Sequence, residues 1–85
     1  MLSISNLSDF GEQFKRERKA LGKTQADVAL LAGLRRETII RIESGENIDL
    51  MTLLKAIAAI NKGLQLVDKQ RPAYDAIPAL FNDEN

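Results

Sequence analysis

The stretch "LRRETIIRIESG", residues 34–45, mixes long charged side chains with isoleucines. On a helix that advances by about 100° per residue, Ile39 and Ile42 lie on one side. Four other residues gather on the opposite side: Arg36, Glu37, Ile40 and Arg41. The first side of this predicted helix is therefore suited to burial, and the second to a polar partner.

The composition is that of one small globular domain. The chain has 85 residues, a formal net charge of +0 and a hydrophobic content of 45%. A single core of this size is only marginally stable, and association with a second copy is the obvious remedy. Nothing in the composition indicates disorder or a low-complexity chain.

The sequence offers few groups for catalysis. It contains no cysteine and no histidine, which excludes disulfides, thiolate nucleophiles, imidazole bases and most zinc sites. The carboxylates of Asp27, Glu37 and Glu43 lack a companion nucleophile, metal set or phosphate loop. We therefore expect no enzyme, no catalytic residue, no metal and no cofactor. No apolar run approaches the length of a membrane span, so a cytoplasmic protein is expected.

The first helix is expected over residues 9–21, after an extended arm of residues 1–8. Ser8 or Asp9 is the candidate N-cap, and Glu12 follows Asp9 at the spacing of a capping box. The apolar stripe of this helix consists of Phe10, Phe14 and Leu21. Continuing the stripe by threes and fours leads to Arg18, so a charge occupies a position where a hydrophobic residue is expected.

Glycines separate the next two predicted helices. Gly22 ends the first helix, and Thr24 is a plausible N-cap for a short helix over residues 25–32. The inner side of that helix is formed by Val28, Ala29 and Ala32. Gly33 can adopt the left-handed backbone of a sharp turn into the third helix, residues 34–44, and Gly45 ends that helix.

The second half of the chain predicts one more helix and a strand. Asp49 is a good N-cap for "LMTLLKAIAAI", residues 50–60, and "NKG" breaks this helix. Its spacing suggests burial of Leu50, Leu53, Ile57 and Ile60. "LQLVD", residues 64–68, alternates like a short strand, which has no stability without a partner strand. From residue 71 the polar end suggests a loosely held tail.

Two short helices joined by a glycine turn, the second with an outward polar face, form a helix-turn-helix unit. The second helix of such a unit can enter the major groove of DNA. The run "LGKTQADVALLAGLRRETIIRIESG", residues 21–45, resembles the lambda-repressor-like, or XRE, helix-turn-helix domains. The matching residues are Thr24, Gln25, Ala29, Gly33, Ile39, Ile42, Glu43 and Gly45. The resemblance implies an all-α DNA-binding repressor of four to five short helices.

The resemblance extends from about Phe10 to Asp68. The run "LMTLLKAIAAINKGLQLVDKQ", residues 50–70, is similar to the end of the HipB-type antitoxins, in which strands from two subunits pair. This implies a helix-turn-helix domain over 9–62, a dimerisation strand over 63–70 and a flexible tail over 71–85. The strand residues implied to pair across the homodimer are Leu64, Gln65, Leu66 and Val67.

The same resemblance implies a function. HipB-type antitoxins repress their own operon and bind a HipA-like serine/threonine kinase toxin. Two alternatives remain open. One is a free-standing, phage-type repressor without a toxin. The other is an interaction module that has lost DNA binding, which the neutral net charge favours.

Helical geometry and the resemblance together assign base contacts to Arg36, Glu37, Ile40 and Arg41. Arginine suits guanine through two hydrogen bonds, glutamate accepts from the cytosine amino group, and isoleucine can touch a thymine methyl. A homodimer would place two such helices roughly 34 Å apart on a palindromic operator. The alternative is that these charges only solvate an exposed helix face.

Phosphate contacts are expected at the starts of the two helices of the motif. Gln25 lies where a helix N-terminus adds partial positive charge. The full set of candidates is Lys23, Thr24, Gln25, Arg35 and Thr38. Arg35 departs from the pattern, because the family usually has Ser or Thr capping this helix and arginine has no acceptor.

Family resemblance further implies that Arg18 and Glu43 form a structural ion pair. Leu30 and Leu31 fall on the side of the second helix that faces solvent in this family. They are either ordinary surface leucines or a contact surface for the toxin.

Overall fold

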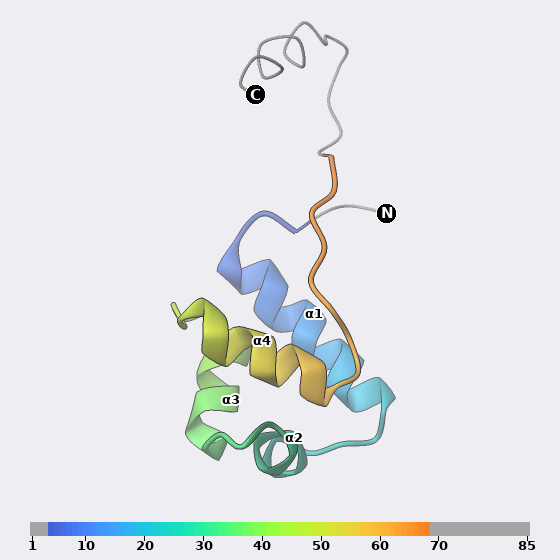
Figure 1. Ribbon diagram of the computed structural model, residues 1–85, viewed down its shortest axis with the longest axis vertical. Coiled ribbons are helices and arrows are strands. Elements are labelled where there is room, and N and C mark those ends of the chain that lie inside the picture. Colours follow the sequence, from blue (N-terminus) through green and yellow to red (C-terminus); the bar gives the residue numbers. More distant parts are fainter. Residues whose placement is uncertain (1–3, 69–85) are drawn as a thin grey trace, which may run out of the picture.

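The computed structural model describes residues 4–68, which contain four helices (Figure 1). These are α1 (Leu7–Ala20), α2 (Gln25–Ala32), α3 (Arg36–Glu43) and α4 (Leu50–Ala59). Within the described residues the fold is therefore all-α, as predicted from the sequence. None of these helices is long and apolar enough to cross a membrane.

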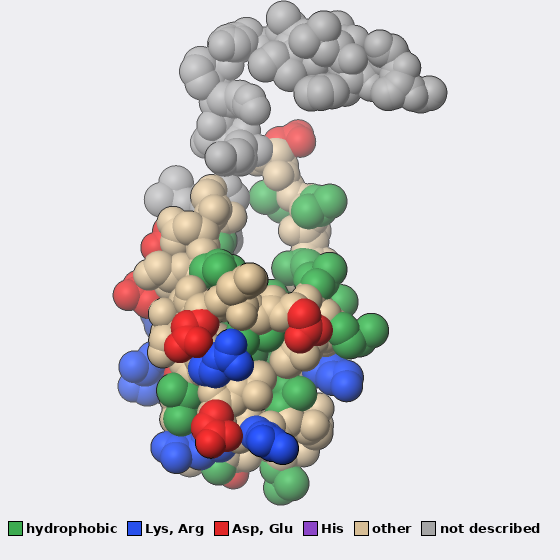
Figure 2. Space-filling view, turned by 90° about the vertical axis from the view of Figure 1, so that its left-hand side faces the viewer, with side chains coloured by type: hydrophobic (Ala, Val, Ile, Leu, Met, Phe, Trp, Pro, Cys, Tyr) green, Lys and Arg blue, Asp and Glu red, His purple; other side chains and the backbone are tan. Residues whose placement is uncertain are grey.

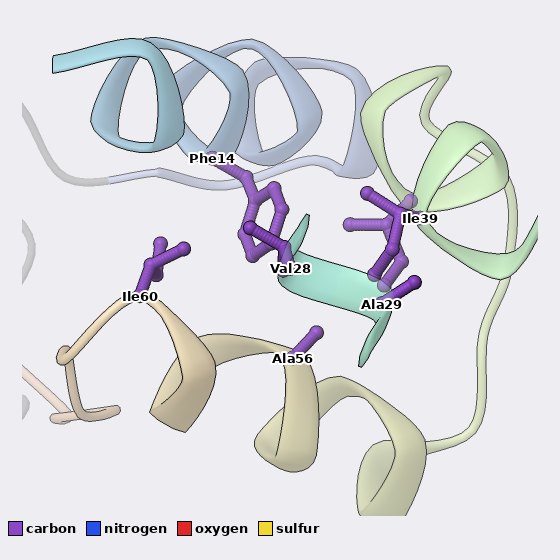
Figure 3. Packing of buried hydrophobic residues seen from close by; sticks show 7 residues of the cluster. Phe14, Val28, Ala29, Ile39, Ala56 and Ile60 are labelled. Carbon is purple, nitrogen blue, oxygen red and sulfur yellow. The ribbon is translucent and has the colours of Figure 1, made fainter. Parts of the chain in front are cut away.

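All four helices contribute side chains to one core. Phe14 of α1, Val28 of α2 and Ala56 of α4 converge with Ile39 of α3 in the space between α1 and α4 (Figure 3). Ile42 belongs to the same cluster and is also buried. The inward orientation of the two isoleucines, predicted from their spacing, is confirmed.

A residue with a left-handed backbone follows shortly after the last residue of each helix: Gly22, Gly33, Gly45 and Asn61. The turn between α2 and α3 shows the use of this conformation. Gly33 has φ +71°, and the N–H of Leu34 donates to the carbonyl of Ala29 over 2.9 Å. At the end of α4 the left-handed residue is Asn61, with φ +64°, and not Gly63. Asparagine adopts this conformation more readily than most residues other than glycine.

The start of α1 differs from the prediction. The helix begins at Leu7, and Asn6 is its N-cap, with Oδ1 accepting from the N–H of Asp9 over 2.8 Å. Ser8 and Asp9 are therefore not caps, and the expected capping box with Glu12 is wrong. The pair Asn6 and Asp9 provides the same kind of stabilisation three residues before the expected pair of Asp9 and Glu12.

Three further positions differ from the prediction. Leu21 is the C-cap of α1 and is exposed, so it does not continue the apolar stripe. Leu34 precedes α3, which begins at Arg36, and packs against the core from the turn. Leu50 is 60% exposed, contrary to the expected burial, because α4 turns Ala56 and Ile60 toward the core.

The segment after α4 leads away from the helices (Figure 1). Residues 61–68 are exposed, and the described chain forms no strand there. Pairing across a dimer stays a prediction, since the strand would need a second chain. Residues 1–3 of the predicted arm, the last two residues of the predicted strand and the tail over 71–85 lie outside the described residues.

Candidate nucleic-acid interface

The two helices of the α2–α3 unit differ in how their N-termini are capped. Thr24 caps α2, with Oγ1 accepting from the N–H of Asp27 over 3.0 Å, and the Asp27 carboxylate accepts from the N–H of Thr24 over 2.9 Å. This reciprocal pair is a capping box. Arg35 is the N-cap of α3 and makes no side-chain capping hydrogen bond. The first turn of α3 therefore keeps backbone N–H groups available for another acceptor.

The outer face of α3 is polar and of mixed charge. Arg36, Glu37 and Arg41 are exposed, and Ile40 is half-buried between them. The face of the molecule that includes α3 shows basic and acidic side chains side by side (Figure 2). The structure thus brings together the four residues for which base contacts are predicted.

Arg18 and Glu43 form the ion pair that the resemblance implied. Arg18 Nε donates to Glu43 Oε2 over 2.6 Å, and Nη2 donates to Oε1 over 3.1 Å. Nη1 donates to the carbonyl oxygen of Lys23 over 2.8 Å. The hydrogen bond to Glu43 raises the pKa of Arg18, against the opposing effect of burial. The pair ties α1 to the last turn of α3.

Gln25 lies between this buried pair and the outer face. Its Nε2 donates to Glu43 Oε1 over 3.1 Å, and its Oε1 accepts from Arg36 Nη2 over 3.4 Å. Gln25 is a phosphate candidate from the sequence, and in the structure its side-chain amide nitrogen is directed toward Glu43. The backbone N–H of Gln25, at the start of α2, remains suited to an anion.

Arg41 has a partner that sequence reasoning missed. Its Nε donates to Glu46 Oε1 over 2.9 Å in an exposed ion pair. Glu46 is the second residue after the C-cap of α3, and Gly45 lies between them. In a helix that ends in this way, that residue lies over the last turn, so the position of the glycine is the signal in the sequence that could have indicated the contact.

An open hollow lies beside the N-terminus of α2. It is lined by Arg18, Lys19, Gly22, Lys23, Thr24, Gln25, Ala26 and Arg36. Three of the phosphate candidates thus share one surface with Arg36, whereas Arg35 and Thr38 lie outside that lining. Lys19 joins this basic surface although the sequence analysis did not single it out. The described residues hold no group of three Asp, Glu, His or Cys side chains arranged for a metal ion.

Residues 14–67 match the helix-turn-helix family. The chain belongs to this family. It is a DNA-binding regulator of the XRE type. α3 is the second helix of its helix-turn-helix motif, the position that is called the recognition helix. No curated protein sequence matches the chain significantly.

Several solved structures are similar to the chain. The restriction-modification controller protein C.AhdI from Aeromonas hydrophila has 33% sequence identity and a TM-score of 0.63, covering 66% of this chain and 86% of that chain. HipB in a complex with an O2 20mer has 25% identity and a TM-score of 0.76, covering 82% of this chain and 99% of that chain. The HipA–HipB–O2–O3 complex matches at 24% identity with a TM-score of 0.76, covering 82% of this chain and 100% of that chain, and shows the shared fold.

The helix-turn-helix motif leaves two large apolar side chains of α2 in solvent. Leu30 is 83% exposed and Leu31 is 61% exposed. Both lie outside the core cluster, as predicted.

Proposed function

We propose that this chain is a homodimeric, sequence-specific transcriptional repressor that acts as the antitoxin of a HipA-like serine/threonine kinase and represses its own operon. The observation that carries the DNA-binding part is the orientation of α3. Ile39 and Ile42 are buried, so Arg36 and Arg41 extend from the outer face.

The proposed base contacts come from four residues of that face: Arg36, Glu37, Ile40 and Arg41. Arg36 and Arg41 each make a hydrogen bond within the chain, to Gln25 and Glu46. Both bonds are exposed, and exposed pairs of this kind contribute only about 0–1 kcal/mol. A guanine can therefore compete for either guanidinium.

The proposed phosphate contacts surround the start of α2 and of α3: Lys23, Thr24, Gln25, Arg35 and Thr38. The N-terminus of α2 carries partial positive charge and backbone donors. For Gln25 we propose that the backbone N–H makes the contact, because the side-chain amide is held by hydrogen bonds to Glu43 and Arg36. Such contacts fix orientation on the duplex without reading sequence.

The proposed homodimer pairs the segment after α4 with the same segment of a second copy. Its predicted strand residues are Leu64, Gln65, Leu66 and Val67. Leu66 is 95% exposed in the single chain, and the other apolar side chains of this segment are also exposed. Contiguous apolar residues in solvent favour a partner that covers them.

The antitoxin role is supported by the likeness to HipB. That likeness covers 82% of this chain, more than the 66% covered by the likeness to C.AhdI, so it reaches further beyond the helix-turn-helix motif. HipB is found in a complex with HipA. Leu30 and Leu31 are the proposed contact surface for the kinase.

A second candidate function is that of a restriction-modification controller, because the identity to C.AhdI is higher, at 33%. The two functions differ in their partner. Expression together with the neighbouring gene, followed by purification through a tag on this chain, tests the antitoxin role. A stable complex with a kinase is expected; a chain that binds its promoter fragment but retains no kinase contradicts that role and favours a controller or a free-standing repressor.

DNA binding itself is tested with a fragment from the promoter of the chain's own gene. The dissociation constant is expected to rise steeply with salt, since neutralising phosphates releases counterions. Absence of binding at low salt would instead support the module that has lost DNA binding.

A further inference from the structure

The backbone at the end of α3 places Glu46 next to Arg41. Gly45 has φ +83°, and its N–H donates to the carbonyl of Ile42 over 3.1 Å. The N–H of Glu46 donates to the carbonyl of Arg41 over 3.0 Å. These two bonds form the Schellman motif, in which the second residue after the C-cap lies over the last turn of the helix.

This turn is also held from outside. A Cβ built on Gly45 would lie 3.0 Å from the Cα of Ser8, so the turn packs closely against the start of α1. A side chain at position 46 therefore leaves the backbone from a fixed point beside the recognition helix.

The side chains of Arg41 and Glu46 also form an ion pair, so the same two residues are joined by backbone and by side chains. Arg41 Nε donates to Glu46 Oε1 over 2.9 Å, and the two side chains are 51% and 53% exposed. Within the described residues this is the hydrogen bond that the Arg41 guanidinium makes. Arginine has five N–H donors in a planar fork, so the edge formed by its two Nη groups stays available. That edge can reach the O6 and N7 atoms of a guanine.

The pair is too exposed to serve mainly as a stabilising contact, because solvent screens exposed ion pairs. Because the pair lies beside the recognition helix, we expect it to affect DNA binding more than stability. The chain has a formal net charge of +0, so attraction to the duplex depends on local basic groups rather than on the whole molecule. The carboxylate of Glu46 neutralises the guanidinium of Arg41, so that side chain offers little net charge to a phosphate.

We propose that Glu46 is a specificity-determining residue, which holds Arg41 with its free edge toward the bases and disfavours duplexes that give Arg41 no guanine. On its preferred site Arg41 gains two hydrogen bonds to a base while it keeps its bond to Glu46. On other DNA, Glu46 neutralises the charge that Arg41 would otherwise offer to phosphates. The inference rests on the proposed repressor function and adds to it how α3 distinguishes one sequence from another.

The test measures the ratio of two dissociation constants. The wild-type chain first selects a preferred duplex from a randomised library. Binding to this duplex and to a scrambled duplex of the same composition is then measured by fluorescence anisotropy at several salt concentrations. The variants are Glu46→Gln, Arg41→Ala and the double variant, with Glu12→Gln as a matched control. Glu12 is an exposed carboxylate on α1, outside α3 and its C-terminal turn.

Glu46→Gln is expected to bind the scrambled duplex about three- to ten-fold more tightly, because Arg41 is then free to offer its full charge to a phosphate. Binding to the preferred duplex is expected to stay equal or to weaken, so the ratio falls. In the Arg41→Ala background the same substitution is expected to leave the ratio unchanged, since the effect acts through Arg41. Glu12→Gln is expected to leave the ratio at the wild-type value.

An unchanged ratio in Glu46→Gln overturns the inference, and so does equal tightening on both duplexes. Thermal melting of each variant, expected to match the wild type, separates these results from a folding defect. If the wild-type chain selects no duplex, the repressor function fails and the inference fails with it. If it selects one and Glu46→Gln does not alter the ratio, only the inference fails.

Discussion

The guanidinium of Arg18 and the carboxylate of Glu43 meet inside the protein, 2.6 Å apart between Nε and Oε2. Their side chains are only 7% and 5% exposed. The two residues are 25 positions apart in the chain, so the bond closes α1 onto the end of the recognition helix.

Replacing Arg18 with Met is therefore expected to destabilise the protein. The substitution leaves the carboxylate of Glu43 buried without its partner, which costs roughly 3–5 kcal/mol. Chemical denaturation measured by circular dichroism checks this loss in the free energy of unfolding. Arg16→Met on the exposed side of the same helix is the control, and it is expected to change stability little. Equal unfolding curves for Arg18→Met and the wild type would contradict the role of the pair.

Gly11→Ala is expected to destabilise the fold through a steric clash. A Cβ at Gly11 would lie 2.6 Å from the carbonyl oxygen of Ile42, so α1 or α3 would have to shift. Forcing a methyl group into such a contact costs about 1–3 kcal/mol. Gly63→Ala is the matched control, because a Cβ there meets no atom within 4 Å. If both variants melt at the same temperature, the close contact between the helices is not needed for stability.

Acid is expected to weaken two helix caps. Hydrogen bonds from the backbone N–H and hydroxyl of Thr24 lower the pKa of Asp27, and those from the hydroxyl and backbone N–H of Thr52 lower the pKa of Asp49. A carboxyl group whose pKa is lowered in the folded state stabilises the fold at pH values above its ordinary pKa of 3.8. This contribution is lost as the pH falls from 3.8 through the lowered pKa of the folded state.

The double variant Asp27→Asn, Asp49→Asn tests these caps by melting temperature as a function of pH. It is expected to melt lower than the wild type at pH 7 and to lose less stability on acidification. Parallel curves for the two proteins would assign the acid sensitivity to other groups.

Two basic residues are expected to affect DNA binding differently. Arg36→Ala should weaken binding to the preferred duplex by roughly 1–3 kcal/mol and change binding to a scrambled duplex much less, since it removes a base contact. Lys23→Ala should weaken both alike and reduce the salt slope by about one. Anisotropy titrations over a salt series measure both quantities. Identical behaviour of the two variants would refute the division between base and phosphate contacts.

A charge in the predicted strand is expected to separate the dimer. Light scattering should give the wild type twice the chain mass of 9.4 kDa, and Leu66→Lys should give the single mass, because the lysine would lie in the proposed interface. Leu30→Lys is the control, since Leu30 is also largely exposed in the single chain, at 83% against 95% for Leu66, but lies on α2. A dimeric Leu66→Lys would exclude the segment after α4 as the interface.

Much of the site followed from local patterns. The spacing of Ile39 and Ile42 predicted which face of α3 is buried, and the exposure of Arg36 and Arg41 followed from it. The absence of a side-chain cap at Arg35 was also predictable, because capping needs an acceptor that arginine lacks.

The hydrogen bonds around that face were not predictable in the same way. Gln25 reaches Glu43, 18 residues later in the chain, so its side-chain amide makes a hydrogen bond within the protein. Which of several polar neighbours a side chain contacts depends on how two helices are placed, and spacing within one helix does not give this.

The sequence by itself determined the four helices, their caps at Thr24 and Asp49, and the left-handed turn at Gly33, because these features depend on residues within a few positions of one another. Only the tertiary structure decided that Gly11 touches α3 and that Leu50 stays in solvent. Such contacts depend on the distance and angle between helices, which all the core side chains set together as they fill one space.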